Sequence, residues 1–308
     1  MKTAVLTVAL AASVLGACID RSSPDDVVGP FTGETHRYVV DSFTLPSTGA
    51  EARALGDDLT GDQSVQNAAG QLIAMLASYG DVTTHAADML AAGTIASSVE
   101  IVADDLSTDD AASVIYIGAD GAPATLVGGT FINGSFRSNR TRKTDAPGAA
   151  ELHLPVYQDA DPSILPLAGV EIDLAPDGAG GFDAIIRGGV TGTTVLDEVA
   201  RGMSEMVASS PYGHTGMLEI FDVAPKDHFV SIEEVKSNSL MKALCSPDTT
   251  VSTDDGDKAA VSAAIGVHLR ACESGNCNLT QTFDRCFDRI LDGDETNVDC
   301  GGSCRACP

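Results

Sequence analysis

Apolar and polar residues alternate in short segments through the middle of the chain, and a spacing of two residues is the pattern of β-strands. Runs rich in Gly, Pro and Asp divide these segments from one another. One such run, 175–180, separates two alternating segments and predicts a β-hairpin. The segments predicted as strands are 36–43, 98–102, 113–118, 125–136, 150–157, 170–174, 181–187 and 259–270.

Apolar residues spaced three or four apart predict helices on both sides of this region. They cover 65–79, 83–92 and 194–209, and a further helical region brackets 216–244. The expected fold class is therefore α+β, a sheet-dominated domain over 34–271. We expect its antiparallel strands to pack in the manner of a β-sandwich, or to form a curved antiparallel sheet that the strand 259–270 closes, with a helical insertion.

The first residues have the pattern of an export signal. Lys2 precedes an apolar stretch, 4–15, that is too short to anchor the chain across a bilayer. The run Leu15-Gly16-Ala17-Cys18 is a lipobox, in which the cysteine thiol receives diacylglycerol. The sequence thus predicts a signal peptide at 1–17, a lipid anchor on Cys18 as the membrane contact, and a polar tether at 18–33. The alternative is a plain signal peptide with an incidental cysteine.

The chain is strongly acidic, with 44 Asp and Glu against 18 Lys and Arg and a formal net charge of −26. Such a charge repels phosphate backbones, which argues against nucleic-acid binding, and it attracts divalent cations. Ile19 follows the lipidated cysteine, where an Asp would signal retention in the inner membrane. We therefore expect the protein at the outer membrane.

The cysteines after Cys18 are confined to the end of the chain, which predicts a disulfide-stapled module at 272–308. In an exported protein, disulfides are a better interpretation than zinc or an iron–sulfur cluster. Their number is odd, so one thiol is free or pairs with another chain. They are Cys245, Cys272, Cys277, Cys286, Cys300, Cys304 and Cys307.

An Asp-rich segment, 56–67, has the spacing of a calcium loop. Counted from Asp58, Thr60 falls at the third position and Asp62 at the fifth, and each offers a side-chain oxygen. The ligand set is poor, because the third position is not acidic, Gly is missing at the sixth, and the twelfth lacks Glu. The competing interpretation, which we favour slightly, is a turn that caps the next helix through Asp62 or Ser64.

A second segment, 218–235, resembles an EF-hand. Asp222 and Asp227 offer carboxylates in its loop, and Glu234 stands where the bidentate twelfth ligand is expected. The first half has slipped by one residue, since an alanine and a lysine occupy positions that need oxygens. We therefore expect an EF-hand-like helix pair within 216–244, without tight calcium binding.

The tail carries a third acidic motif, Asp292-Gly293-Asp294-Glu295-Thr296-Asn297-Val298-Asp299-Cys300-Gly301-Gly302-Ser303-Cys304-Arg305-Ala306-Cys307. This motif closely resembles a Cys-rich module appended to surface lipoproteins of myxobacteria and their relatives, although Asn297 stands where the module usually has Asp. Three aspartates either hold a calcium ion or cap tight turns: Asp292, Asp294 and Asp299. The four cysteines of the module permit three disulfide pairings: Cys286, Cys300, Cys304 and Cys307.

The rest of the chain resembles, more faintly, a family of uncharacterised lipoproteins from the same bacteria. In that family a Gly- and Asp-rich segment opens the domain and an EF-hand-like helix pair lies near its end. The segments 56–70 and 221–235 follow this order. The resemblance implies calcium as the cofactor and supplies no activity.

Sequence motifs of the common hydrolases and phosphate-binding enzymes are missing, and six histidines are scattered along the chain. We therefore expect a non-enzymatic binding or structural protein, lipid-anchored in the cell envelope, with weak or vestigial calcium loops. Its protein or glycan partner is not named by the sequence. The alternative is a hydrolase anchored to the outer membrane, with an active site that no motif reveals.

Overall fold

The computed structural model describes residues 31–272, apart from 60–63, 78–81, 119–126, 140–147, 158–159, 224 and 254. The predicted signal peptide, Cys18, most of the tether and the Cys-rich module beyond Cys272 lie outside the described residues. Among the described residues, no helix is both long enough and apolar enough to cross a bilayer.

Ten strands form one antiparallel sheet in the order β1–β2–β3–β4–β5–β7–β8–β10–β9, and β6 pairs with β7 beside this path. Their bounds are β1 Glu34–Thr44, β2 Ser98–Ala103, β3 Thr108–Ile117, β4 Val127–Ile132, β5 Ser135–Ser138, β6 Ala149–Leu154, β7 Ser163–Pro176, β8 Phe182–Thr191, β9 Thr249–Thr253 and β10 Gly256–Ala271. The prediction of a sheet-dominated antiparallel domain is confirmed.

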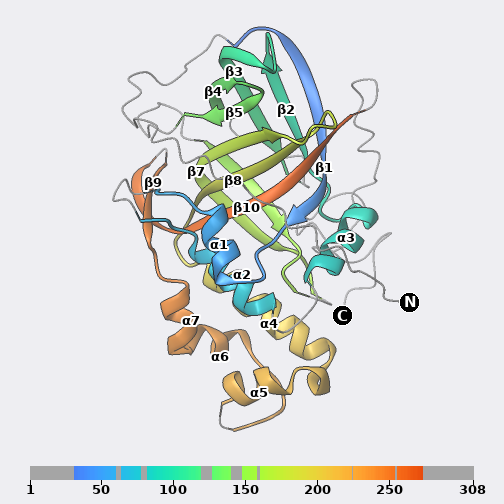
Figure 1. Ribbon diagram of the computed structural model, residues 1–308. Helices are drawn as coiled ribbons and strands as arrows, with labels where there is room; N and C mark the ends of the chain where they lie inside the picture. Colours follow the sequence, from blue (N-terminus) through green and yellow to red (C-terminus); the bar gives the residue numbers. More distant parts are fainter. Residues whose placement is uncertain are drawn as a thin grey trace, which may run out of the picture.

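The sheet closes on itself, because β1 pairs with β10 as well as with β2 (Figure 1). Of the two arrangements that the sequence left open, the β-sandwich is therefore wrong and the curved antiparallel sheet is found. One sheet curls into a ring instead of two sheets lying face to face. Closure pairs the backbone groups that the first and last strands of the ring would otherwise leave at open edges.

Alternate side chains of the strands fill the inside of the ring. Four aromatic side chains form its centre, with ring centroids 5.2 Å apart for Tyr38 and Phe182 and 5.3 Å apart for Phe131 and Phe136. Ile265 on β10 faces its β8 partner Ile186, and both are almost fully buried. These contacts make the described interior a packed side-chain core that supports the surrounding strands.

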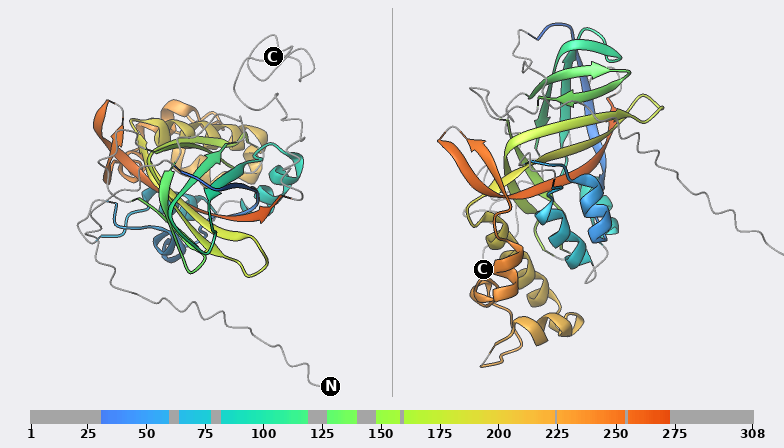
Figure 2. Two further views of the ribbon diagram at one scale, coloured as in Figure 1. Left: turned by 90° about the horizontal axis from the view of Figure 1, so that it is seen from above. Right: turned by 60° about the vertical axis from the view of Figure 1, so that its left-hand side comes forward.

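Helices cover the outside of the ring (Figures 1 and 2). Helix α2 packs on β10, α1 packs on α2 and β10, α3 on β1, and α4 on β7. A short 3-10 helix, η2, and three short helices follow at one end, opposite the start of β1. The bounds are α1 Gly49–Leu55, α2 Ala68–Leu76, α3 Val82–Ala92, α4 Thr194–Ser209, η2 Pro211–Gly213, α5 Thr215–Phe221, α6 Ile232–Ser237 and α7 Ser239–Leu244.

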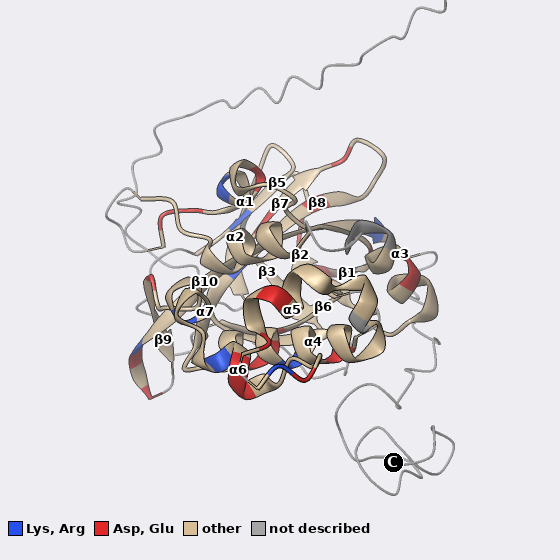
Figure 3. Cartoon of the chain, turned by 90° about the horizontal axis from the view of Figure 1, so that it is seen from below, with Lys and Arg blue, Asp and Glu red and all other residues tan. Residues whose placement is uncertain are grey.

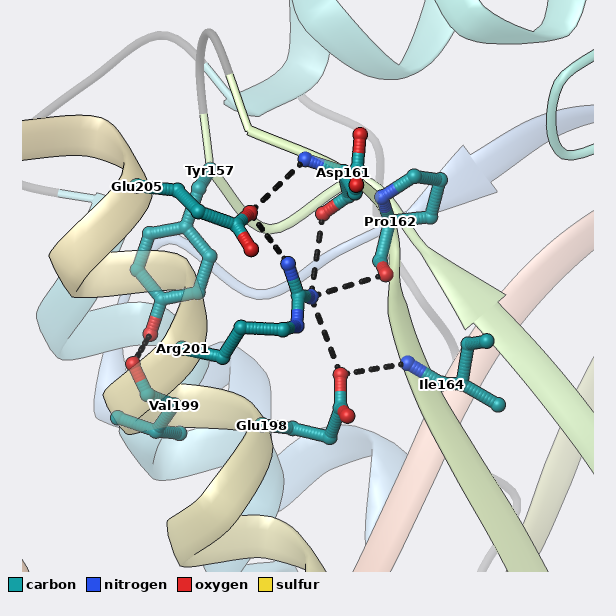
Figure 4. A network of polar contacts seen from close by, with 8 residues as sticks. All are labelled: Tyr157, Asp161, Pro162, Ile164, Glu198, Val199, Arg201 and Glu205. Atoms are coloured by element: carbon teal, nitrogen blue, oxygen red, sulfur yellow. Dashed lines mark hydrogen bonds and ion pairs between the residues drawn. The ribbon is translucent and has the colours of Figure 1, made fainter. Parts of the chain in front are cut away.

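Helix α4 is fastened to the connection between β6 and β7 by a network of polar contacts around Arg201 (Figure 4). The guanidinium of Arg201 pairs with Glu198 and Glu205 and donates to the carbonyls of Asp161 and Pro162. Glu198 accepts the backbone N–H of Ile164 at 3.1 Å. The two terminal nitrogens of the guanidinium are thus paired, and these contacts fix the position of α4.

The ring of Tyr157 completes this attachment. Its hydroxyl donates to the carbonyl of Val199 at 3.3 Å, and a Cβ at Gly202 would lie 2.3 Å from the ring. Burial raises the pKa of Tyr157 well above its ordinary value, so the hydroxyl keeps its proton. Only a glycine at position 202 lets α4 approach the ring this closely.

Candidate functional site

The structure describes four of the nine predicted metal ligands: Asp58, Asp222, Asp227 and Glu234. Thr60 and Asp62 lie outside the described residues, together with the tail aspartates and the four cysteines of the C-terminal module. The helix pair 216–244 is therefore the predicted site that the structure describes most fully.

Helices α5 and α6 flank a loop within the region 216–244, and apolar side chains hold both helices on the domain. Met217 and Phe221 of α5 are buried, and so are Val230 at the end of the loop and Val235 of α6. The inward face of the helix–loop–helix is thus part of the core. These buried side chains hold the loop in place without a bound ligand.

The two aspartates of the loop shape its backbone. Asp222 is only 4% exposed, and its carboxylate accepts the backbone N–H groups of Asp227 and His228, at 3.3 and 3.1 Å. Asp227 in turn accepts the N–H of Phe229 at 3.0 Å. Both carboxylates therefore act as turn-forming acceptors.

Glu234 closes the other side of the loop. Its carboxylate accepts the N–H of Val223 at 3.0 Å and both the N–H and the hydroxyl of Ser231 at 2.8 Å. The Ser231 hydroxyl accepts the N–H of Glu234 in return, which completes a capping box at the start of α6. These hydrogen bonds, chiefly those from Ser231, lower the pKa of Glu234.

One backbone angle retains the geometry of a calcium loop. When Glu234 is counted as the twelfth residue, His228 is the sixth, where such loops require a glycine. His228 has a φ of +64°, the left-handed conformation that glycine adopts most easily. The same count makes Val223 the first residue, so Asp222 stands one position before the place of the first ligand.

The arrangement holds its shape through its own hydrogen bonds. A calcium ion at Glu234 would compete with three hydrogen bonds that this carboxylate already accepts within the loop. Over the described part of the chain, no group of three or more His, Cys, Asp or Glu side chains is arranged to hold a metal ion.

The first acidic segment is ordered by amide side chains. The backbone N–H of Gln66 donates to the carbonyl of Asp57 at 2.9 Å. The side-chain Oε1 of Gln66 accepts the N–H of buried Leu59 at 2.7 Å, and together these two hydrogen bonds close the loop. Asn67 caps α2 by accepting the N–H of Gly70. The expectation that Asp62 or Ser64 would be the cap is wrong, because the helix begins later than its apolar pattern.

Asn67 also joins three elements of the domain. Its Nδ2 donates to the carbonyls of Ala52 and Ala264, at 2.9 and 3.0 Å, and its Oδ1 accepts the N–H of Ala264 at 2.9 Å. The side chain is 1% exposed, and both of its polar atoms are saturated. Asn67 thus links α1, α2 and β10, a role the sequence analysis missed.

The sequence analysis also missed a cluster around His268. Its Nδ1 lies 2.6 Å from Asp41 Oδ1, and its Nε2 lies 3.2 Å from Asp177 Oδ2. Arg270 Nε lies 3.5 Å from the other oxygen of Asp41. The hydrogen bond with Asp41, more than that with Asp177, raises the pKa of His268 against the opposing effect of burial. No local pattern signals this cluster, since 227 residues separate His268 from Asp41.

This cluster contains the residue types of a proton-transfer site, but its hydrogen bonds connect separate elements of the fold. Both ring nitrogens of His268 already face carboxylates, so the imidazole bridges β1, β10 and the β7–β8 turn. A general base needs one ring nitrogen directed at the hydroxyl or water that it deprotonates. The arrangement therefore favours a structural role at the β1–β10 seam.

The cysteines settle one alternative left open by the sequence. Cys245 is a free thiol, buried at the C-terminal end of α7, and burial raises its pKa to about 11, which keeps it protonated and unreactive. Cys272 is disulfide-bonded, and its partner lies outside the described residues.

No family model matches this chain, and the searches of curated proteins and of solved structures found no match either. Function is therefore argued from the sequence and from the geometry described above.

Proposed function

We propose that this protein is a lipid-anchored binding protein of the cell envelope that acts without catalysis and whose helix–loop–helix needs no calcium. The proposal that the helix–loop–helix needs no calcium rests on the hydrogen bonds of Asp222 and Glu234. Their carboxylates accept N–H groups of the loop itself. The lipobox ending at Cys18 and the Ile19 that follows it support attachment at the outer membrane.

The architecture suits a binding protein. A closed sheet with a packed interior is a rigid support, and the Arg201 network fixes α4 against it. The strongly acidic composition disfavours nucleic acid and anionic lipid as ligands. A protein or glycan on the envelope remains the partner class that we propose.

The anchor is tested by expressing the full chain in a bacterium that processes lipoproteins and feeding it an alkyne-tagged fatty acid. We expect the label on the protein and the protein in the outer-membrane fraction. Cys18→Ser should abolish both, whereas Cys245→Ser, which removes a buried thiol of the folded domain, should retain the label. Labelling that survives Cys18→Ser would refute the lipid anchor.

The calcium-independent loop is tested by thermal unfolding of the mature protein with millimolar calcium and with a chelator. A ligand at a hundred times its Kd stabilises the folded state by about 2.7 kcal/mol, an effect such a measurement resolves. We expect equal Tm values. A higher Tm in calcium that disappears in Glu234→Gln would contradict the proposal, whereas one that disappears only in Asp292→Asn would place the ion in the tail.

A further inference from the structure

Exposed apolar side chains are concentrated at the helical end, which we define as η2 through α7. Eight large hydrophobic residues are exposed in the described part of the chain, and six of them lie between residues 212 and 240. Val65 and Ile132 are the two outside it. Scattered single residues such as these are ordinary, but a concentration on one end is not. The six are Tyr212, Ile220, Val223, Phe229, Ile232 and Leu240.

These residues are held on a fixed frame. The same helices bury Met217, Val235 and Met241 on their inner sides. The Asp222 and Glu234 hydrogen bonds fix the loop, and Lys236 of α6 forms an ion pair with Asp197 of α4 at 2.6 Å. A surface that is already ordered loses little conformational entropy on binding, which favours affinity.

Acidic residues share the helices and loop of this end with the apolar ones, and Figure 3 marks acidic positions on α5 and α6. The helical end contains five acidic residues and three lysines, of which Lys236 is paired with Asp197. Glu219, Asp227 and Glu233 are exposed, whereas Asp222 is buried and Glu234 is bonded within the loop. Because the whole chain also carries a formal net charge of −26, a second copy of it or an anionic membrane would bring like charge to this surface.

The helical end is placed to meet a partner on the side away from the proposed lipid anchor. The described chain enters the fold at the start of β1, and the helical end lies at the opposite end of the molecule (Figures 1 and 2). If the proposed lipid anchor holds the first end, the helical end is presented away from it.

We infer that the helical end is a docking surface for a protein segment with an apolar face bordered by Lys and Arg. The apolar side chains supply the buried centre of the contact, and the acidic ones around them pair with the basic rim of the partner. The inference deepens the proposed binding function and rests on it.

The test uses the purified mature protein at 0.15 M salt and three fluorescent helical peptides of equal length. One combines Leu with Lys, one Ser with Lys, and one Leu with Glu. We expect saturable binding of the Leu/Lys peptide, at least tenfold weaker binding of the Ser/Lys peptide, and none of the Leu/Glu peptide. Equal binding of the Leu/Lys and Ser/Lys peptides would show that net charge alone drives the interaction, and would overturn the inference.

Variants then locate the binding site. Tyr212 is 95% exposed, so Tyr212→Ser leaves the core untouched, and Phe229→Ser can be added to it. We expect the double variant to bind the Leu/Lys peptide at least tenfold more weakly. The matched control Ile132→Ser, which removes a 61% exposed side chain on the sheet, should bind as the wild type does. Unchanged affinity in the double variant overturns the inference.

Two further measurements decide between occupants. Association of the mature protein into dimers that Tyr212→Ser abolishes would identify a second copy as the occupant and refute the basic partner. Binding to vesicles of anionic phospholipid that the same variant abolishes would refute it in favour of a membrane. The tests use unlipidated protein, so failure here leaves the Cys18 labelling experiment to decide the anchor independently.

Discussion

The described parts of the two acidic loops, 56–67 and 222–231, are held in different ways. In the first, the amides of Gln66 and Asn67 hold the backbone, and Asn67 is buried among three elements. In the second, the carboxylates of buried Asp222 and partly exposed Glu234 do so. An amide donates and accepts without charge and can be saturated in a core. A carboxylate only accepts and responds to pH. Similar spacing of polar residues thus serves either to join distant elements or to shape a single loop.

The largest effect is expected from Asn67→Ala. The substitution leaves the buried carbonyl of Ala52 and both backbone groups of Ala264 without their partner. At roughly 1–3 kcal/mol for each unsatisfied group, partly relieved by local adjustment, we expect a loss of about 4 kcal/mol in the free energy of unfolding, measured in urea.

The matched control for Asn67 is Asn238→Ala, which removes only the N-cap of α7. Loss of a cap costs about 1 kcal/mol. Equal losses for the two variants would show that Asn67 acts as a cap alone, and the contrast between the loops would disappear.

The next largest effect is expected from Glu234→Ala, which removes the capping box and the contact with Val223. We expect a loss of about 1–2 kcal/mol at pH 7, measured by the same unfolding experiment. Because the pKa of Glu234 is lowered by folding, its contribution is present above the unfolded value of 4.5 and is lost as pH falls through the folded value. The two proteins should therefore converge in stability in acid.

Glu233→Ala is the control for that experiment, since Glu233 neighbours Glu234 on α6 and is exposed. Its removal should change stability by less than about 0.5 kcal/mol at either pH. A pH-independent loss in Glu234→Ala would argue against hydrogen bonding to the ionised carboxylate.

A smaller effect of opposite sign is expected from His228→Gly. The left-handed φ of His228 costs about 1 kcal/mol, which glycine relieves at the expense of greater freedom in the unfolded chain. We expect a net gain of about 0.5 kcal/mol. His214→Gly, at a position with a φ of −119°, should give no gain. A loss at both positions would show that the His228 side chain contributes contacts that outweigh the strain.

The smallest change in stability is expected from the titration of His268. Its pH range distinguishes this cluster, at the pairing of β1 with β10, from the two acidic loops. Folding raises the pKa of His268, so its stabilising contribution is complete below the unfolded value of 6.5 and is lost as pH rises through the folded value. Amides do not titrate, and Glu234 titrates far below this range. Stability should therefore fall from pH 6 to 9 in the wild type and less steeply in His268→Gln. His36→Gln should keep the wild-type slope.

Local patterns predicted the elements well and their partners poorly. Helix α4 matches its predicted range of 194–209, because its apolar residues recur over four turns. Helix α1 was missed, since seven residues give too little periodicity. Strand β9 was missed as well, because it is short and mostly polar. The segment 125–136 proved to be a hairpin that turns at Asn133-Gly134, a signal that the sequence did contain.

Long-range contacts account for the rest. Alternation along 259–270 allowed this strand to be placed as the one that closes the sheet, but alternation along β1 does not show that β10 lies beside it, so the pairing and its register were not predictable. The same holds for Asn67, whose partner Ala264 is 197 residues away. In the helix–loop–helix the sequence offered Asp222, Asp227 and Glu234 as metal ligands. It could not show that backbone N–H groups would occupy them.

The pairing of β1 with β10 has a mechanical consequence. The described chain enters at the start of β1 and leaves at Cys272, whose N–H donates to the carbonyl of Arg37 at 2.9 Å. Traction between these two ends would open the β1–β10 ladder one hydrogen bond at a time, from Tyr38 and Ala271 inward. Traction between the start of β1 and the helical end would instead load the strands along their length, where many hydrogen bonds resist together. The fold should therefore yield readily to force applied between the start of β1 and Cys272, and resist force applied between the start of β1 and the helical end.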